Sequence, residues 1–171
     1  MLDLFSGTGA ASAAMEERGW RVVRVELDPT FPADHRDVRT FTWAGPRPDL
    51  VWCSPPCTEF SRESMPWCRT GKPPSLALVE AALRIVASAA PRWWVLENVR
   101  GARKWLRPLL GEPFQHCGPV WLWGSPPPML WPQVRPWKEK LGGRNKARRA
   151  AIPYEISRAL AIAIERARAA A

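Results

Sequence analysis

Short apolar segments alternate with helix-forming segments along most of the chain, and this alternation restricts the fold more than any other feature. The predicted strands cover residues 1–5, 21–27, 49–54, 92–98 and 120–123. The predicted helices cover residues 9–19, 75–90, 102–110 and 153–170. Because parallel strands need a helix-sized connection between them, the pattern predicts an α/β fold with a mostly parallel sheet flanked by helices.

Three residues mark the expected ends of these helices. Ser75 is suited to an N-cap, Gly19 to the position just after a helix, and Pro153 to a helix start. The chain has 171 residues and no internal repeat, which predicts one domain over 1–171.

Several classes of protein are disfavoured by composition. No apolar run reaches the roughly 18 residues of a membrane span, and the first residues do not resemble a signal peptide. We therefore expect a cytoplasmic protein without a membrane segment. The cysteines are too few and too unevenly spaced for a disulfide scaffold, and paired C-x2-C zinc knuckles are absent, so no metal is expected.

A net charge of +9 favours a polyanionic partner, and nucleic acid is the obvious one inside a cell. The proline-rich and basic segment 125–149 concentrates this charge in 133–149, where Trp137 stands among lysines and arginines. This composition predicts a mobile loop that follows a nucleic-acid backbone, although a merely solvated loop has the same composition.

A glycine-rich turn, DLFSGTGA over 3–10, joins the first predicted strand to the first predicted helix. In an open α/β sheet such a turn faces the ligand site, and Gly7 and Gly9 allow a close approach of the backbone. Glu26 and Asp28 end the second strand, where a carboxylate can bind ribose hydroxyls. A tight turn without any ligand remains the alternative at this point.

The chemistry of the expected ligand follows from what accompanies this turn. Asp37 is a third acid, suited to an adenine amino group, and no phosphate-binding lysine follows the glycines. A nucleoside without phosphates, such as S-adenosylmethionine, therefore fits better than ATP or NAD.

Two prolines directly before a cysteine, in CSPPCTEFS over 53–61, form a second unusual stretch. Pro55 and Pro56 stiffen the backbone after an apolar strand, so the side chain of Cys57 is held in one place. The residue is either presented for chemistry or a chance thiol in a proline-rich loop. We expect Cys53 and Cys117 to be buried as small apolar residues.

The Pro-Pro-Cys loop, the strand end WWVLENV over 93–99 and the DLFSGTG turn, in this order, resemble the DNA (cytosine-5)-methyltransferase family. The chain looks most like short, phage-type members, and AAIPYEISRALAIAIE over 150–165 is similar to the last family motif. The resemblance covers most of 1–101. It implies a Rossmann-like methyltransferase fold and transfer of a methyl group from S-adenosylmethionine to carbon 5 of a flipped cytosine in DNA.

The resemblance implies a role for each catalytic residue. Cys57 would add as a thiolate to carbon 6 of cytosine, which makes carbon 5 nucleophilic. Glu97 would hold or protonate ring nitrogen 3, which requires a raised pKa of the kind that neighbouring apolar side chains supply. Asn98 would position the loop, and Arg135 would contact the cytosine. The loop 59–75 would close over the substrate.

The resemblance also implies a set of cofactor-binding residues. They come from the first turn, the second strand end, the acid after it and the proline loop: Asp3, Phe5, Gly7, Gly9, Glu26, Leu27, Asp37, Val38 and Pro56.

The chain departs from the family pattern in three places. The second arginine of the Gln-x-Arg-x-Arg motif is replaced by Trp137, and the usual tryptophan at the second strand end is replaced by Leu27. A target-recognition domain of on the order of a hundred residues has no room here. We therefore expect relaxed specificity, a homodimer or a partner that supplies recognition.

Two other functions remain open from the sequence. The same chemistry could act on RNA, single-stranded DNA or a free nucleotide. A catalytically silent DNA-binding module would retain the fold without methyl transfer, although the intact Cys57 and Glu97 weigh against it.

Overall fold

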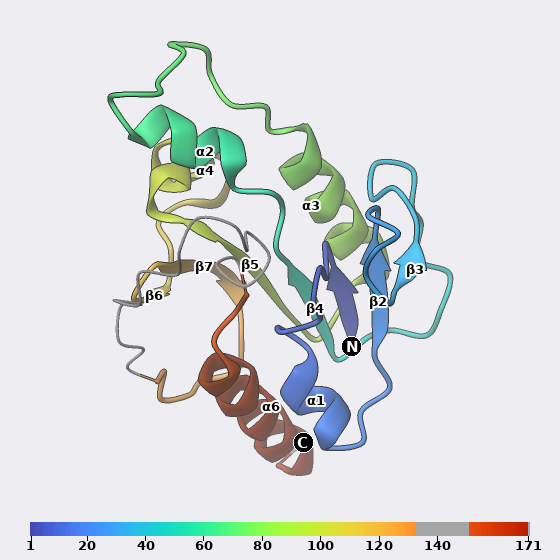
Figure 1. The fold of residues 1–171 in the computed structure, drawn as a ribbon. Helices are drawn as coiled ribbons and strands as arrows, with labels where there is room; N and C mark the ends of the chain where they lie inside the picture. The colour runs from blue at the N-terminus through green and yellow to red at the C-terminus, as the bar shows by residue number, and fades with distance from the viewer. Residues whose placement is uncertain (133–150, 171) are drawn as a thin grey trace.

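A computed structural model of the chain describes residues 1–132 and 151–170 (Figure 1). Its seven-stranded sheet has the order β3-β2-β1-β4-β5-β7-β6. The strands β1 to β5 pair with one another in parallel, whereas β7 is antiparallel to β5 and to β6. The predicted α/β class with a mostly parallel sheet is therefore confirmed.

The strand bounds follow the apolar segments of the sequence. They are β1 Leu2–Leu4, β2 Val23–Glu26, β3 Asp34–His35, β4 Leu50–Cys53, β5 Trp93–Val99, β6 Gln115–Cys117 and β7 Val120–Ser125. The helices are α1 Ala13–Glu17, α2 Thr58–Ser64, α3 Ala77–Ala89, α4 Arg103–Leu110, preceded by a 3₁₀ turn over Arg100–Ala102, and α6 Tyr154–Ala169.

Helices cover both faces of the sheet. Figure 1 shows α1 and α6 together on one side and α2, α3 and α4 on the other. Alternate residues of β4 supply the two cores: Leu50 and Trp52 pack toward α1 and α6, whereas Val51 and Cys53 pack toward α3. All four β4 residues are buried, as expected for a parallel strand covered on both faces.

The last helix completes the core under the first turn. Ile156, Leu160 and Ile164 of α6 are fully buried in the cluster that contains Met15 of α1. The buried Ser157 hydroxyl donates to the carbonyl of Ala11 (2.8 Å) and accepts from the amide of Ala14 (3.2 Å).

The helix ends agree only partly with the sequence predictions. Gly19 has a φ of +77° directly after the α1 C-cap, and Pro153 is the residue before α6, as predicted. The helix α1 is shorter than expected because Ser6–Ser12 form turns. Leu76, not Ser75, is the N-cap of α3, although the Ser75 hydroxyl still accepts the amide of Ala77 at 3.3 Å.

Three elements were not expected from the sequence: β3, β6 and α2. The helix α2 corrects the prediction of one continuous loop over 59–75. Pro55 and Pro56 stop the strand but do not prevent a helix, because Cys57 is already the N-cap and Thr58 the first helical residue. The predicted basic loop 133–149 lies outside the described residues.

Candidate active site

The carboxyl ends of the parallel strands bring the predicted functional segments to one edge of the sheet. The turn after β1, the end of β2, the proline loop after β4 and the end of β5 meet there. This edge is where open α/β sheets bind ligands.

A cavity of about 730 Å³ opens at this edge, a size typical of small-molecule sites. Six residues of the predicted cofactor set line it: Phe5, Glu26, Leu27, Asp37, Val38 and Pro56. Apolar side chains from α2 and α3, among them Phe60 and Leu78, form part of the wall. The lining thus combines aromatic and aliphatic surface with acids and with two arginines, Arg39 and Arg62, and the apolar surface suits a nucleoside.

The glycine turn is tied to the end of β2. The Gly7 amide donates to Oε2 of Glu26 (2.8 Å), and the amides of Leu27 and Asp28 donate to Oε1 (2.8 and 3.1 Å). The Glu26 carboxylate thus holds two turns together at the cavity, and its remaining lone pairs are the ones available to a ribose.

Arg24 contacts the glycine turn. Its Nε donates to the hydroxyl of Ser12 (3.1 Å), and its Nη2 pairs with Glu16 (2.6 Å). Gly9 has a φ of +76°, and a Cβ there would lie 2.3 Å from the Arg24 guanidinium. Gly7 and Gly9 shape the turn and are not among the residues that line the cavity.

Asp3 lies beneath the turn, outside the cavity lining. It is completely buried, and its Oδ2 accepts the hydroxyl of Ser12 at 2.7 Å, whereas its Oδ1 has no partner in the described structure. Burial raises the pKa of Asp3 to about 7. This geometry gives Asp3 a supporting position under the turn and no direct contact with a ligand in the cavity.

Arg39 forms hydrogen bonds with Asp37, the predicted adenine-binding acid. Its guanidinium and its amide donate to Asp37, with Nε 2.9 Å from Oδ2 and the amide 2.9 Å from Oδ1. These bonds lower the pKa of Asp37. An adenine amino group would therefore share this carboxylate with Arg39, a contact that the sequence did not reveal.

Cys57 stands at the start of α2, half-buried. Burial raises the pKa of its thiol, and a hydrogen bond with Ser61 partly offsets that effect. Cys53 and Cys117 are buried, as expected, and Cys68 is exposed.

Glu97 and Asn98 end the neighbouring strand β5. Burial raises the pKa of Glu97 to about 7, in the direction that the sequence predicted. Glu97 also raises the pKa of the Cys57 thiol, which places the two groups within electrostatic reach of each other. The fully buried Asn98 donates from Nδ2 to the carbonyl of Pro55 (2.9 Å), so it holds the proline loop to β5. Arg135 lies outside the described residues.

Two carboxylates of α2 brace the following loop, residues 65–75. Glu63 accepts the amides of Thr70 (2.9 Å) and Gly71 (3.2 Å), and Glu59 accepts the amide of Ser75 (2.6 Å). The Thr70 hydroxyl also donates to Glu63 and, together with the amides of Thr70 and Gly71, lowers the pKa of Glu63 to about 2. Neither acid was predicted from the sequence, because the contacts appear only when the loop folds back.

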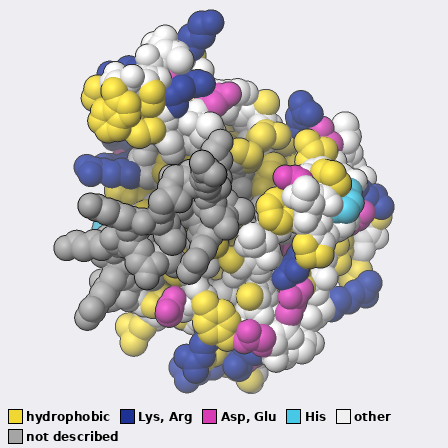
Figure 2. All heavy atoms as spheres, in the orientation of Figure 1, with side chains coloured by type: hydrophobic (Ala, Val, Ile, Leu, Met, Phe, Trp, Pro, Cys, Tyr) yellow, Lys and Arg dark blue, Asp and Glu magenta, His cyan; other side chains and the backbone are white. Residues whose placement is uncertain are grey.

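The braced loop presents Trp67, which is 81% exposed. Arg69 and Lys72 on the same loop are also exposed. In Figure 2 the projection at upper left, which corresponds to this loop in Figure 1, carries hydrophobic side chains next to basic ones.

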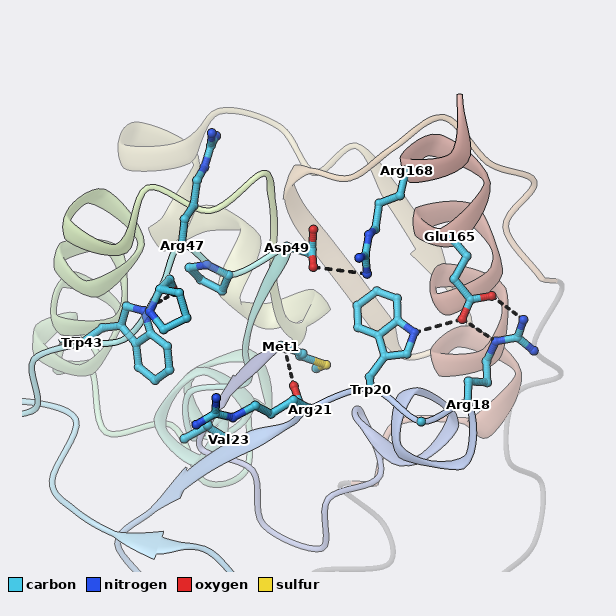
Figure 3. A pocket seen from close by; sticks show the side chains of 13 residues that line it. Met1, Arg18, Trp20, Arg21, Val23, Trp43, Arg47, Asp49, Glu165 and Arg168 are labelled. Carbon is cyan, nitrogen blue, oxygen red and sulfur yellow. Dashed lines mark hydrogen bonds and ion pairs between the residues drawn. The ribbon is translucent and has the colours of Figure 1, made fainter. Parts of the chain in front are cut away.

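A second cavity, of about 490 Å³, has Met1, the start of β2 and the end of α6 in its lining (Figure 3). Four of its charged side chains form ion pairs: Arg18 pairs with Glu165, and Arg168 pairs with Asp49 (3.4 Å). Trp20 also donates to Glu165 at 2.9 Å. These contacts join α6 to the ends of the segments next to α1 and β4, and they give Arg18 and Arg168 a structural role.

Within residues 1–132 and 151–170, no group of three or more His, Cys, Asp or Glu side chains is arranged to hold a metal ion. None of the helices in that part of the chain is long and apolar enough to cross a membrane.

Comparisons with known proteins identify the family of the chain. The sequence profile of the C-5 cytosine-specific DNA methylase family matches residues 1–106. A Frog virus 3 (isolate Goorha) protein named Probable DNA (cytosine-5)-methyltransferase is 32% identical over 112 residues, which are 57% of this chain and 52% of that protein. The chain therefore spans about half the length of this relative.

Among solved structures, the chain is similar to one described as a DNA modification methyltransferase encoded within an E. coli prophage. The TM-score is 0.47 and the identity 18%, over 72% of this chain and 45% of the other.

Proposed function

Since the chain belongs to the C-5 cytosine-specific DNA methylase family, we propose that it transfers a methyl group from S-adenosylmethionine to carbon 5 of cytosine in DNA through a covalent adduct of Cys57. The observation that supports this best is the pairing of a half-buried Cys57 with Glu97, whose pKa is raised to about 7, at the ligand-binding edge of the sheet.

The cavity at this edge fits S-adenosylmethionine. Phe5, Leu27 and Val38 offer apolar surface for the adenine ring, and Glu26 offers carboxylate oxygens to the ribose. When bound, the cofactor supplies a methyl group activated by its sulfonium. Pro56 lines the same cavity one residue before Cys57, which supports a short path between cofactor and nucleophile.

Cys57 and Glu97 divide the chemistry between them. The Cys57 thiolate attacks carbon 6 of the flipped cytosine, and Glu97 holds a proton at ring nitrogen 3, so negative charge does not build up on the ring. Carbon 5 then becomes nucleophilic and accepts the methyl group. Water then takes the proton from carbon 5, the Cys57 sulfur leaves carbon 6 as a thiolate, and the proton on ring nitrogen 3 returns to Glu97, which restores the aromatic base and the starting state of the two side chains.

The pKa values of the two groups set the pH dependence. The active form has a Cys57 thiolate and a protonated Glu97. Because Glu97 is the stronger acid, most molecules with one proton on these two groups carry it on Cys57 instead. The active form is therefore the minor of the two singly protonated forms. Its population rises as the pair loses its first proton, at a pH near the pKa of Glu97, and falls when the second proton leaves. We expect kcat/KM to rise through about pH 7.

The loop 65–75 is proposed to contact DNA. Exposed Arg69 and Lys72 suit phosphates, and the exposed indole of Trp67 suits stacking on a base near the site of the flipped cytosine. Glu59 and Glu63 hold the loop in this form, so part of the ordering cost is met before DNA binds.

The test is a covalent trap. The protein is incubated with labelled S-adenosylmethionine and duplex DNA that contains 5-fluorodeoxycytidine, whose fluorine blocks the final elimination. We expect a band that survives denaturation, is absent for Cys57→Ala and persists for Cys68→Ala, which removes the exposed cysteine. A persistent band in Cys57→Ala would exclude the nucleophile assignment.

The alternatives predict other results in the same experiment. If RNA, single-stranded DNA or deoxycytidine monophosphate is the substrate, label enters that molecule faster than duplex DNA. If the chain is a silent binding module, DNA binds in a salt-dependent manner and label enters none of the four substrates.

A further inference from the structure

Two side-chain contacts join the end of β4 to the end of β5, and the proposed mechanism uses only one of them. Asn98 holds the Pro55 carbonyl. One residue earlier in each segment, Ser54 directly follows β4 and stands next to Glu97 of β5, and its hydroxyl lowers the pKa of the Glu97 carboxyl group. The parallel register explains this pairing, because Cys53 lies opposite Leu96 and the next pair along is Ser54 and Glu97.

Trp52 orients the Ser54 hydroxyl. The Trp52 side chain is 1% exposed, and its indole N–H donates to the Ser54 oxygen at 2.7 Å. An indole nitrogen can only donate, so the serine oxygen must accept this bond. The single hydrogen of the serine hydroxyl is then free to point toward Glu97, and Ser54 acts as a donor to the carboxyl group.

We propose that Ser54, oriented by Trp52, is a positioning residue that occupies one carboxyl oxygen of Glu97 and leaves the other oxygen to carry the proton delivered to the cytosine. The inference rests on the proposed function, since it assigns Glu97 the role of proton donor. Without the serine hydroxyl, both carboxyl oxygens are equivalent, and the proton spends time on the oxygen that does not face the base.

The surroundings of Glu97 make the effect of Ser54 on the pKa of Glu97 measurable. Burial has the largest effect on its pKa and raises it, and the Ser54 hydrogen bond opposes that rise. On the strand β7, which pairs with β5, the residue opposite Glu97 is the apolar Leu122. Among the described residues, the titratable side chain whose pKa the Glu97 charge raises is Cys57. Removal of the Ser54 hydroxyl therefore raises the pKa of Glu97 further.

A titration that does not depend on activity tests the contact. The carboxyl carbon of Glu97 is followed by ¹³C NMR against pH in glutamate-labelled protein, and Glu97→Gln identifies the signal. We expect Ser54→Ala to move the titration midpoint upward from about 7 and Ser54→Thr, which keeps a hydroxyl, to leave it in place. An unchanged midpoint in Ser54→Ala would overturn the proposal.

A matched pair of tryptophan variants tests the role of Trp52. Trp52→Phe removes the N–H that orients Ser54, and we expect a smaller upward shift of the Glu97 midpoint. Trp123 is equally buried, but its indole donates to the carbonyl of Gly111 at 3.2 Å. Trp123→Phe should therefore leave the midpoint unchanged, and equal shifts in both variants would contradict an orienting role for Trp52.

Kinetics separates positioning from folding. Since a hydrogen bond to a charged group is worth about tenfold in a rate, we expect Ser54→Ala to lower kcat about tenfold with an unchanged KM for DNA, and Ser54→Thr to recover most of it. The rising limb of kcat/KM against pH should move upward in Ser54→Ala. If Ser54→Ala has the kcat of the wild type and an unchanged pH dependence of kcat/KM, Ser54 is not a positioning residue. If the wild-type chain transfers no methyl group, the proposed function is wrong, and the NMR titration alone decides whether Ser54 contacts Glu97.

Discussion

The side-chain amide of Asn98 lies 2.9 Å from the backbone carbonyl of Pro55, so the strand that carries the acid holds the loop that carries the thiol. Asn98 is fully buried, and Pro55 is followed by a second proline. The contact thus links a rigid loop to a rigid strand. The contact fixes the spacing of Cys57 and Glu97, as the proposed mechanism on one small ring requires.

Gly9→Ala should weaken cofactor binding more than Gly19→Ala, although the two substitutions strain the backbone to a similar extent. Both Gly9 (φ +76°) and Gly19 (φ +77°) have left-handed backbones, so alanine costs about 1–2 kcal/mol of stability at either place. Only at Gly9 would the new Cβ displace Arg24. Calorimetry with S-adenosylmethionine should show lost affinity for Gly9→Ala and near wild-type affinity for Gly19→Ala; equal affinities would disprove the role of this crowding.

Leu27→Trp should tighten binding of S-adenosylmethionine by roughly threefold to tenfold, since an aromatic contact adds about 0.5–1.5 kcal/mol. Leu27 lines the larger cavity and is 61% exposed, so a larger ring has room. Calorimetric titration measures the effect, and Leu109→Trp, on an exposed part of α4, is the control. Unchanged or weaker binding would show that adenine does not rest on residue 27.

Trp67→Ala should weaken DNA binding about tenfold, because stacking on one base is worth about 1–3 kcal/mol. Leu130→Ala removes another highly exposed side chain (94%) and should have little effect. Fluorescence anisotropy with labelled duplex DNA measures both. We expect a smaller defect on DNA with a mispaired target cytosine, which leaves the stack more easily; an equal defect on paired and mispaired DNA would count against a role beside the flipped base.

Asp3 should make the protein less stable as the pH rises. Its pKa is raised from 3.8 to about 7 in the folded chain, so its contribution to stability is complete below pH 3.8 and is lost as the pH rises from 3.8 through about 7. Glu97 acts in the same direction between 4.5 and about 7.

Urea unfolding at pH 5 and pH 8 measures this effect. Wild type should lose on the order of a few kcal/mol, and Asp3→Asn should lose clearly less. The pKa of exposed Asp28 is lowered by Thr30, so Asp28→Asn should keep the wild-type difference. A wild-type difference in Asp3→Asn would show that Asp3 is not the group responsible.

The parts of the fold that were predictable depend on local pattern. The runs at Leu50–Cys53 and Trp93–Val99 are buried strands because apolar side chains are needed on both faces of a covered sheet. Short elements were missed because tertiary contacts decide them. The two residues of β3 pair with β2, and α2 is held by buried Phe60 and by Glu59 and Glu63.

The candidate site was predictable where a residue type and its place in the chain suffice. Cys57 and Glu97 follow neighbouring parallel strands, so their strand ends had to meet. Contacts across a strand end were not predictable in this way. The link from Trp52 through Ser54 to Glu97 depends on which strand lies beside β4 and in which register, and the Arg39 contact depends on how one turn closes on Asp37.

The hydrogen bonds of Ser157 to Ala11 and Ala14 have a consequence for how the protein is made. The segment that supports the glycine turn is translated more than 140 residues after it. Until α6 leaves the ribosome, the apolar side of α1 and of the central strands has no cover. The glycine turn therefore gains this support only after α6 has been synthesised, long after the turn itself.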